Sequence, residues 1–373
     1  MSDSQFVIPV HGAESIADYA PGGLHPVHIG DKFCDGRYTV VNKLGHGRSS
    51  TIWHILDSQT NTYAALKIAA SARSSTARRE IAVQQHLEAR FDAADLGSKY
   101  VVRMLDHFVH EGPNGHHQCI VEEALGPSLA ADNSCFTDGR PVLDAVHSMA
   151  AQLVLGLRYL HKRGVVHGDP HLANILLCIP ETEAGSNHQR LMRSPPNKAF
   201  HGAPPSPHRP DYLVVGLDAR MHEDTYRALF RSNPQIKLCD FGDSYFPGMA
   251  NPPRVLVAPQ LYRPPEALLL EQILPSVRTD VWALAVLLHC LASGGAAPFA
   301  FTVDECLAGM AHHLGHFSPI LWRMWPNRDK FFDRNGQLRL DLDEEDDMYV
   351  PPTLLGTRVD TIMPVDGAER EAF

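Results

Sequence analysis

The sequence predicts an α+β fold in two lobes, a small β-rich lobe followed by a larger, mainly helical one. Strand-like segments separated by turn residues run from Arg37 to about Glu123. After Gly126 the pattern changes, because residues 142–164 carry apolar side chains at helical spacing and end in a Lys-Arg-Gly helix stop. We therefore divide the chain into an N-terminal extension (residues 1–36), a small lobe (37–123) and a large lobe (124–373).

The small lobe is predicted to begin with three strands, followed by one helix. Residues 37–44, 50–58 and 62–70 are strand-like, and Gln59-Thr60-Asn61 between the last two is a hairpin signal. A helix is predicted over residues 76–90. The extension before these elements carries turn signals at Pro21-Gly22-Gly23 and Asp35-Gly36, which indicate an extended arm.

One segment of the large lobe raises the question of a membrane. Residues 281–303 contain no Asp, Glu, Lys or Arg and are long enough to span a bilayer. Because Gly294, Gly295 and Pro298 interrupt the segment, a buried core helix over about Val281–Ala292 is the favoured interpretation. We therefore expect no membrane partner.

Two other stretches of the large lobe have an unusual composition. Residues 180–235 include the sequence SPPNKAFHGAPPSPHRPD, which has no periodicity and predicts a flexible, Pro-rich insertion. Residues 341–347, DLDEEDD, hold six acids in seven positions. A solvated acidic loop is the favoured interpretation of this run, and recruitment of an Arg-rich substrate is the alternative.

Composition excludes several classes of protein. The 373-residue chain has a formal net charge of −10, and since phosphate binding needs a basic face, we expect no direct nucleic-acid partner. Its seven cysteines include no CxxC pair, which indicates neither a zinc site nor a disulfide framework and fits a reducing intracellular compartment. Residues 1–15 lack the basic start and apolar core of a signal peptide.

The sequence LGHGRSSTIW, residues 44–53, lies between two predicted strands. Gly45 and Gly47 would let the backbone N–H groups approach phosphates, although a plain tight hairpin explains an isolated GxG better. Lys67 lies among apolar residues in the next strand, where a lysine is ordinarily a snorkelling or edge residue. It becomes a phosphate ligand if a carboxylate fixes it, and Glu80 in the following helix is placed to do so.

The polar sequence HGDPHLAN, residues 167–174, lies between two apolar segments that each look like a buried strand, where unpaired polar groups are costly. Farther along, Asp240-Phe241-Gly242 follow another apolar strand. Together with the Gly-rich hairpin and the strand lysine, these pieces resemble the protein-kinase signature set. LYRPPEALLL (261–270) and RTDVWALAVLL (278–288) look like the family's closing APE element and the start of its central buried helix.

This resemblance implies the bilobal protein-kinase fold and a role for each residue. Phosphoryl transfer needs mainly positioning and charge neutralisation. Asp169 would accept the proton of the attacking hydroxyl, Asn174 and Asp240 would hold Mg²⁺, and His167 would brace the loop. Lys67, fixed by Glu80, would bind the phosphates of ATP. The resemblance further implies ATP-binding positions at Leu44, Gly45, His46, Gly47, Arg48, Ser49, Ser50, Ile52, Glu123 and Leu125.

The resemblance narrows to the SR-protein kinase branch. Residues 22–57, the hinge-like VEEALGPSL (121–129), the insertion before Asp240 and DKFFDRNGQLRL (329–340) are similar to that branch. Its members are Ser/Thr kinases that phosphorylate Arg/Ser-rich splicing factors in the cytoplasm and nucleus. The resemblance implies the same substrate class, the cofactors ATP and Mg²⁺, and the same location for this chain, which we expect to be a monomer.

Five features depart from the family pattern. Gly168 replaces the usual Arg and the segment 243–263 is short, so we do not expect control by loop phosphorylation. His171 occupies the position where protein kinases carry a Lys beside the γ-phosphate, and Glu122 the position of a bulky apolar residue behind the adenine. The chain also ends at Phe373, where family members would continue through their last helices, so we expect a truncated C-terminus.

These features leave three functions open. An active Ser/Thr protein kinase is favoured, because the residues that contact Mg²⁺·ATP and the nucleophile by family pattern are present. A pseudokinase that binds nucleotide or acts as a scaffold is the alternative, supported by His171, Glu122 and the chain end. The third function, a small-molecule kinase, is supported only by the sequence HGDPH (167–171). The protein-kinase-like stretches 261–270 and 278–288 argue against it.

His171 has two interpretations of its own. If a protonated imidazole replaces the family's lysine, turnover should fall as the pH rises from about 6.5 to 8.5, because imidazole loses its charge over that range. In the other interpretation His171 is a neutral residue that braces the loop through hydrogen bonds.

Overall fold

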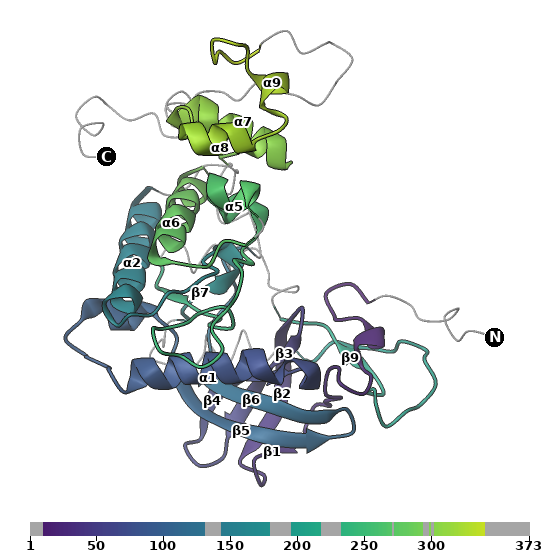
Figure 1. Ribbon diagram of the computed structural model, residues 1–373. Coiled ribbons are helices and arrows are strands. Elements are labelled where there is room, and N and C mark those ends of the chain that lie inside the picture. Colours follow the sequence, from purple (N-terminus) through teal and green to yellow (C-terminus); the bar gives the residue numbers. More distant parts are fainter. Residues whose placement is uncertain are drawn as a thin grey trace.

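The protein folds into two lobes, one built on a sheet with a long helix and the other mainly on helices (Figure 1). The computed structural model describes residues 10–130, 143–179, 195–217, 233–270, 272–293, 298–299 and 302–339. The sheet and its helix come first in the chain, and most of the helical lobe follows residue 143. This architecture confirms the bilobal α+β fold that the sequence predicts.

The N-lobe is built on a six-stranded antiparallel sheet with the strand order β1-β2-β3-β4-β6-β5. The strands are β1 (Lys32–Phe33), β2 (Tyr38–Gly47), β3 (Ser50–Asp57), β4 (Thr62–Ala69), β5 (Met104–Gly112) and β6 (Gly115–Glu123). The β3–β4 hairpin turns where the sequence predicts it, and Asn61 there has a φ of 54°, a left-handed conformation that asparagine tolerates. Buried Trp53, Ile55 and Leu66 form the core of this lobe.

Helix α1 (Ser74–Glu88) begins and ends two residues before the predicted helix and packs on the sheet. Its buried apolar side chains are Ala77, Ile81, Val83 and Leu87. Two polar side chains of the same helix are also buried, since Glu80 is 2% and Gln84 is 3% exposed. Buried polar groups need hydrogen-bond partners, so both residues have to find one across the interface with the sheet.

The core of the C-lobe lies between α2 (Leu143–Lys162) and α6 (Val277–Ala292). Helix α6 begins with a capping box in which the side chains of Ser276 and Thr279 each accept a backbone N–H of the other. The uncharged segment that follows Asp280 therefore forms a core helix, as predicted. Within the described ranges, we find no helix with the length and apolar character needed to cross a membrane.

A small two-stranded sheet carries the polar loops of the C-lobe. Strands β7 (Ile175–Leu177) and β10 (Ile236–Leu238) pair antiparallel, with Ile175 opposite Leu238. Because β7 follows Asn174 and β10 precedes Asp240, this pairing brings the ends of the two polar segments together. A backbone hydrogen bond of 2.9 Å from the N–H of Cys239 to the carbonyl of Asn174 extends the pairing.

The remaining helices of the C-lobe are short and pack around aromatic residues. They are α5 (Pro265–Leu269), α7 (Val303–Leu314), α8 (Pro319–Met324) and α9 (Arg328–Phe331). Trp325 is fully buried among them, and its Nε1–H donates to Oδ1 of Asp304 at 2.7 Å. The acidic run at 341–347 lies outside the described residues.

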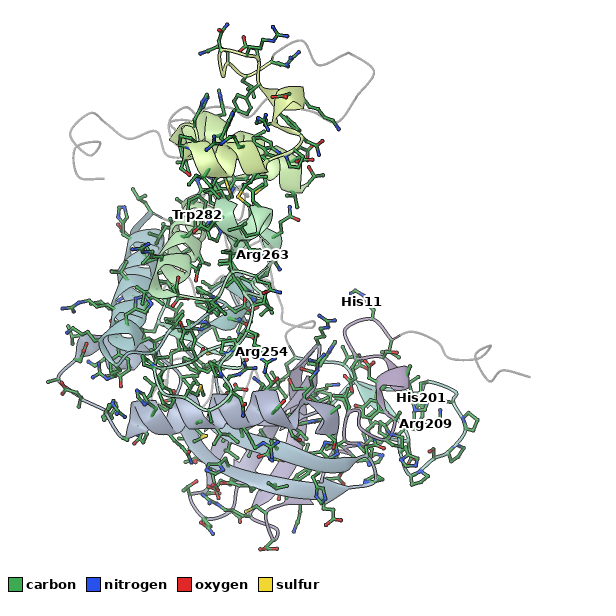
Figure 2. All side chains as sticks on the ribbon, viewed as in Figure 1. His11, His201, Arg209, Arg254, Arg263 and Trp282 are labelled. Carbon is green, nitrogen blue, oxygen red and sulfur yellow. The ribbon has the colours of Figure 1, made fainter. Side chains whose placement is uncertain are left out.

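Residues 195–217 of the predicted insertion pack against the N-lobe, which corrects the expectation of a flexible segment for this part. Strands β8 (Lys198–Ala199) and β9 (Leu213–Val214) pair here, and Leu213 and Val214 are 2% and 1% exposed. The Pro-rich composition does not predict this packing, because only a few apolar residues at the end of the segment are needed to attach it to the N-lobe. Figure 2 shows His201 and Arg209 of this segment beside the N-lobe.

The N-terminal extension, described from Val10 onward, also packs on the N-lobe. Glu14 forms a buried ion pair with Lys43 of β2, and the hydroxyl of Tyr19 donates to the same carboxylate. The backbone N–H of Leu217 donates to the carbonyl of Lys43 at 3.0 Å. Extension and insertion therefore meet on the strand that leads into the Gly-rich hairpin.

Farther along the extension, three imidazoles pack together on the sheet. The ring centroid of His25 lies 4.5 Å from that of His110 in β5 and 5.0 Å from that of His117 in β6. We call these three residues the histidine cluster. His25 and His117 are 7% and 0% exposed, so the cluster joins the extension to the sheet through buried titratable side chains.

Candidate active site

Lys67 of β4 forms the centre of the site, where the two lobes meet. Its Nζ lies 2.8 and 2.9 Å from the two carboxylate oxygens of Glu80 and 2.9 Å from Oδ1 of Asp240. Ile52 of the Gly-rich hairpin is its cross-strand partner, so the two side chains share one face of the sheet. The structure thus brings together Lys67 and the predicted carboxylate, and it adds a second one. We call Lys67, Glu80 and Asp240 the catalytic cluster.

Ion pairing keeps Lys67 charged although its side chain is largely buried. Burial opposes the charge of Lys67, but the carboxylates of Asp240 and Glu80 outweigh it and raise the pKa of the ammonium above its ordinary value. The ammonium in turn lowers the pKa of Asp240 to about 2. Burial raises the pKa of Glu80, and the attraction of Lys67 opposes that rise. The site therefore holds a permanent cation next to an ionised carboxylate.

Asp280 of α6 fixes the loop that contains Asp169. The side chain of Asp280 is 0% exposed, and its oxygens accept the backbone N–H of His167 at 2.8 Å and of Gly168 at 2.9 Å. Nε2 of His161 in α2 lies 2.9 Å from the same carboxylate. Our sequence reasoning assigned no role to Asp280. The sequence signal for this role was the position of Asp280 directly before the uncharged residues 281–303. A carboxylate buried there needs hydrogen-bond donors to compensate for its burial.

His167 connects this loop to the segment around Asp240. Its ring is fully buried, with Nε2 3.2 Å from the carbonyl oxygen of Cys239 and its centroid 5.4 Å from that of Phe241. Its Nδ1 accepts the N–H of Asp169 at 3.3 Å. These contacts fit the bracing role that the resemblance implies for His167.

Asp169 and His171 lie next to each other. Nε2 of His171 is 3.4 Å from Oδ2 of Asp169, while Nδ1 accepts the N–H of Ala173 at 3.2 Å. A ring that accepts at Nδ1 carries its proton on Nε2, so His171 turns a donor toward the carboxylate. The other oxygen of Asp169, Oδ1, is buried and has no hydrogen-bond partner within the described part of the chain.

Gly168 has a backbone conformation and surroundings that leave no room for a side chain. Its φ is 84°, and a Cβ at this position would lie 2.4 Å from the carbonyl oxygen of Asp243. Any larger residue would have to displace the backbone that leads away from Asp240. The carbonyl of His167 accepts the hydroxyl of Ser244 at 2.6 Å, and Val166 and Tyr245 form a β-bridge. The start of the segment 243–263 is therefore held by direct contacts with this loop.

The residues predicted to hold Mg²⁺ are compatible with that ion. Asp240 has a φ of 63°, in the left-handed region where strained residues of functional sites are found, and its side chain is 50% exposed. Nδ2 of Asn174 donates to the carbonyl of Asp169 at 3.0 Å, which leaves the amide oxygen available to a metal. Mg²⁺ is usually held by one or two protein oxygens together with phosphates and water. The described residues contain no cluster of three His, Cys, Asp or Glu side chains that could hold a metal ion.

The Gly-rich sequence forms the β2–β3 hairpin, with Arg48 and Ser49 at its turn. Gly47 pairs with Ser50 across this turn, and Gly45 pairs with Ile52 beside a register shift in β2. Leu44 and Ile52 are half-buried, whereas His46, Gly47 and Arg48 are exposed. The exposed tip is free to cover a bound group, which is the arrangement that the phosphate-loop interpretation requires.

Leu125 offers a donor at the junction between the lobes. Its side chain is 8% exposed, and among the described residues no acceptor contacts its backbone N–H. The next residues pair with β7, since the N–H of Gly126 donates to Leu177 and that of Leu129 to Ile175. The free N–H of Leu125 suits the edge of a purine base. Glu123 plays a different part, because its carboxylate forms an ion pair with Lys237 and accepts the N–H of Arg103.

Glu122 lies beside the catalytic cluster, not at the hinge surface. Its Oε1 accepts a hydrogen bond of 3.0 Å from Nε2 of Gln84 in α1. Burial and the nearby carboxylate of Glu80 raise the pKa of Glu122 to about 8, although Lys67 lowers it. Gln84 is a residue that sequence reasoning missed. The signal for it was a polar side chain one turn after Glu80, on the face of α1 that meets the sheet.

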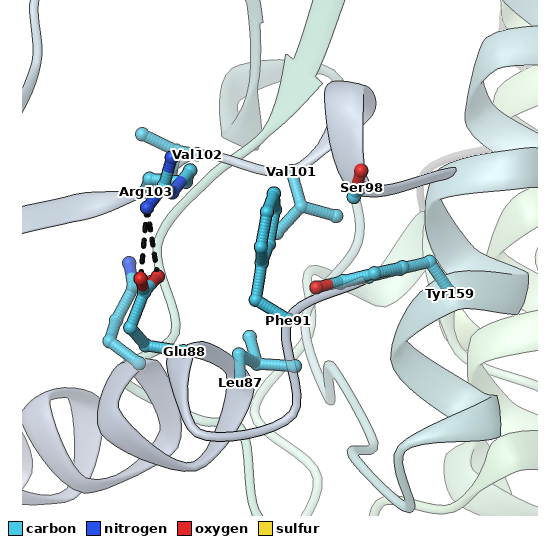
Figure 3. Close-up of a pocket in the computed structure, with 9 residues that line it drawn as sticks. Leu87, Glu88, Phe91, Ser98, Val101, Val102, Arg103 and Tyr159 are labelled. Carbon is cyan, nitrogen blue, oxygen red and sulfur yellow. Dashed lines mark hydrogen bonds and ion pairs between the residues drawn. The ribbon is translucent and has the colours of Figure 1, made fainter. Parts of the chain in front are cut away.

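A separate hollow lies at the C-terminal end of α1, between that helix, the segment that follows it and α2 (Figure 3). Its empty volume is about 280 Å³, partly open to solvent, and Phe91, Val101 and Tyr159 line it. Arg103 and Glu88 form an ion pair of 2.9 Å at its rim. Gln84 also borders this hollow, so the contact between Gln84 and Glu122 lies between it and the catalytic cluster.

Comparison with known proteins agrees with this geometry. Residues 38–184 match the family model of the protein kinase domain. The chain is 30% identical over 343 residues to the serine/threonine-protein kinase SRPK of Physarum polycephalum, an alignment that covers 87% of this chain and 78% of that protein. It is also 39% identical over 171 residues to the protein kinase dsk1 of Schizosaccharomyces pombe and 39% identical over 197 residues to human SRSF protein kinase 3.

The fold and the site thus define a protein kinase. The chain belongs to the SRPK family of protein kinases, since the Physarum relative is matched along most of its length. The alignments cover 45% of this chain and 31% of dsk1, and 52% of this chain and 33% of the human kinase. The chain therefore spans about a third of the length of these two relatives. Protein kinases in general use ATP and Mg²⁺.

Proposed function

We propose that this chain is an ATP-dependent serine/threonine protein kinase that transfers the γ-phosphate to protein hydroxyl groups. The observation that carries the proposal is the contact of Lys67 with both Glu80 and Asp240, at 2.8 and 2.9 Å. This contact ties together the sheet, α1 and the segment after β10. In protein kinases the lysine–glutamate pair and the metal-binding aspartate must both be in place for transfer.

The chain's own residues would bind the nucleotide at three points. The backbone N–H of Leu125 would donate to the base, the hairpin tip at Gly47 would cover the phosphates, and Lys67 would contact them. Asp240 and Asn174 would hold Mg²⁺, which neutralises charge on the phosphates when bound. The raised pKa of Lys67 keeps the ammonium charged at any physiological pH, so phosphate binding would not depend on its titration.

Asp169 would orient the hydroxyl of the substrate and accept its proton. Its Oδ1 is buried and without a partner in the described part of the chain, so this oxygen is available for the incoming O–H. Its Oδ2 faces Nε2 of His171 at 3.4 Å, which would steady the carboxylate. A fixed acceptor aims the hydroxyl oxygen at the phosphorus, and such positioning supplies much of the catalysis in phosphoryl transfer.

We propose Arg/Ser-rich proteins as substrates, in the cytoplasm or the nucleus. A human relative carries the name SRSF protein kinase 3, and the net charge of −10 favours a cationic substrate. Clustered carboxylates pair well with guanidinium groups, and the acidic run 341–347 offers such a cluster in the sequence. The chain would act as a monomer, with neither a nucleic acid nor a membrane as its direct partner.

The proposal is tested by phosphate transfer from γ-labelled ATP to an Arg/Ser-repeat peptide. A Lys/Ser peptide of the same charge tests the need for guanidinium, and an Arg/Ala peptide serves as the blank. We expect label in the Arg/Ser peptide, less in the Lys/Ser peptide, and none with the Lys67→Met variant. Equal labelling of the Arg/Ser and Lys/Ser peptides would contradict the substrate class, although not the kinase activity.

A non-catalytic nucleotide-binding or scaffolding protein is the second candidate. The observation that favours it is His171 in the position of the family's lysine, with its Nε2 3.4 Å from Oδ2 of Asp169. This candidate predicts a thermal shift with Mg²⁺·ATP but no transfer to any hydroxyl in a single turnover. Transfer at the level of the Lys67→Met blank, together with normal nucleotide binding, would decide for it.

A further inference from the structure

Two polar side chains of α1 reach across to the sheet, one helical turn apart. Glu80 contacts Lys67 of β4 at 2.8 Å, and Nε2 of Gln84 donates to Oε1 of Glu122 in β6 at 3.0 Å. Both α1 residues are almost completely buried. Residues four apart on a helix lie on the same face, so these two contacts leave α1 in the same direction.

The strand register places the two sheet partners on one face as well. Strands β4 and β6 are neighbours, and Glu122 lies opposite Ala65, which is two residues from Lys67. Side chains two residues apart in a strand point to the same face, so Lys67 and Glu122 both point toward α1. The interface between α1 and the sheet therefore contains two polar contacts side by side.

We propose that Gln84 and Glu122 are positioning residues for nucleotide binding, because their hydrogen bond holds α1 to the sheet one turn away from the contact between Glu80 and Lys67. This inference rests on the proposed function, in which Lys67 binds phosphate. If α1 moved away from the sheet at Gln84, Glu80 on the preceding turn would move with it. Lys67 would then keep only Asp240 as its partner.

The surroundings of Glu122 make this contact sensitive to protonation. The groups that face it are Glu80 from α1, Lys67 from β4, and Asp240 and Cys239 after β10. Burial and the charge of Glu80 raise the pKa of Glu122 to about 8, so its carboxyl is mostly neutral at pH 7. At higher pH it ionises and adds a third negative charge around Lys67. That charge opposes a bound polyphosphate and competes with it for the ammonium.

Equilibrium binding of Mg²⁺·ATP to the full chain between pH 7 and 9.5 tests the inference. The variants are Gln84→Leu, Glu122→Leu, their double mutant and Glu122→Gln. The matched control is Gln85→Leu, the next residue of α1, which is exposed. Melting temperatures measured in parallel separate a loss of stability from a loss of nucleotide affinity. Lys67→Met reports whether the binding measured occurs at the proposed site.

We expect each single leucine variant to bind Mg²⁺·ATP about tenfold more weakly at pH 7, because it leaves a buried polar partner unsatisfied. The double leucine variant should bind no more weakly than the poorer single variant, since an apolar pair can replace the contact. The affinity of the wild-type protein for Mg²⁺·ATP should fall about fivefold from pH 7 to 9.5. Glu122→Gln should retain the affinity at pH 7 and abolish this fall, a change that a merely structural role would not produce.

Two results would overturn the inference. Leucine variants that bind Mg²⁺·ATP as Gln85→Leu does, with the pH profile of Glu122→Gln unchanged from wild type, would show that the contact does not position the site. If the Lys67→Met variant nevertheless fails to bind Mg²⁺·ATP, the proposed function stays intact and only this inference is wrong. Wild-type protein that fails to bind Mg²⁺·ATP would overturn the proposed function and this inference together.

Discussion

The catalytic cluster and the histidine cluster both hold ionisable side chains against the sheet of the N-lobe, and the two clusters behave in opposite ways. In the catalytic cluster a lysine lies between two carboxylates, and the pKa of Lys67 is raised while that of Asp240 falls to about 2. In the histidine cluster three imidazoles pack against one another. Burial lowers the pKa of all three, that of His25 to about 3, and the neighbouring imidazoles add to the effect.

Burial and neighbouring charges together decide which of these side chains stay ionised. Burial alone penalises a charged form, so it favours a neutral imidazole and would favour a neutral lysine. Opposite charges within 3 Å reverse that outcome at Lys67, whereas like groups strengthen it at His25. The catalytic cluster therefore keeps the charge that the proposed phosphate binding requires, and the histidine cluster joins the extension to the sheet as neutral packing.

The largest effect should come from removing the cation of the catalytic cluster. Lys67→Met leaves Glu80 and Asp240 without their shared partner and removes the proposed phosphate ligand. We expect single-turnover transfer to fall about 10²–10³-fold, the usual cost of losing one electrostatic contact with the reacting group. Lys99→Met, at an exposed lysine, is the control. Transfer within twofold of wild type would contradict the role of the cluster.

Asp280 differs from both clusters, because it is a fully buried carboxylate that is held mainly by hydrogen bonds. Asp280→Ala leaves the N–H groups of His167 and Gly168 and the ring of His161 without their acceptor. We expect the free energy of unfolding to fall by about 3 kcal/mol, measured by denaturant titration. Asp329→Ala, at a carboxylate with an 81% exposed side chain, should change it little. Similar losses in both variants would argue against the anchoring role of Asp280.

The histidine cluster should make the fold sensitive to acid. Because the folded state lowers the pKa of His25, the unfolded chain binds more protons below about pH 6.5, and stability decreases as the pH falls. Between pH 6.5 and 5 this amounts to about 2 kcal/mol for one fully neutral histidine. His25→Phe should lose less stability over the same range in thermal or denaturant unfolding. An identical acid sensitivity in that variant would exclude His25 as the cause.

The smallest effect is expected at His171, whose two interpretations remain in competition. Its acceptor contact at Nδ1 and its donor toward Asp169 favour the neutral brace. The brace predicts a flat rate profile from pH 6.5 to 8.5 and no gain in His171→Lys. A replaced lysine predicts a falling profile and a gain of about tenfold in kcat at the alkaline end for His171→Lys, or about 1.4 kcal/mol. Transfer rates of both proteins across this range decide between them.

Much of the fold could be predicted because it depends on local patterns. The sequence predicts helices over 76–90 and 281–292, the second from its uncharged run, and the structure places them at Ser74–Glu88 and Val277–Ala292. The β3–β4 turn follows from residues 59–61. The packing of residues 195–217 could not be predicted, because Leu213 and Val214 find their partners far away in the chain. Composition reports the average character of a segment, whereas a few apolar residues are enough to dock it.

In the candidate site, too, contacts that follow from local sequence could be predicted, and contacts that depend on distant partners could not. Motif spacing predicted that Lys67 and Glu80 would meet, and the structure places them 2.8 Å apart. The roles of Asp280 and Gln84 depend on which backbone or strand faces them, and a single sequence does not report this. Gly168 illustrates the limit, since the sequence showed a missing arginine but not the left-handed backbone that a glycine suits there.

The measurement that tests the central claim most directly is single-turnover transfer by Asp169→Ala, with Mg²⁺·ATP affinity determined on the same protein. If Asp169 orients and deprotonates the hydroxyl, transfer should fall about 10²-fold or more while nucleotide affinity stays within about twofold of wild type. Asp329→Ala provides the matched loss of an exposed carboxylate. Unchanged transfer in Asp169→Ala would contradict the assignment of this site as the centre of a protein kinase.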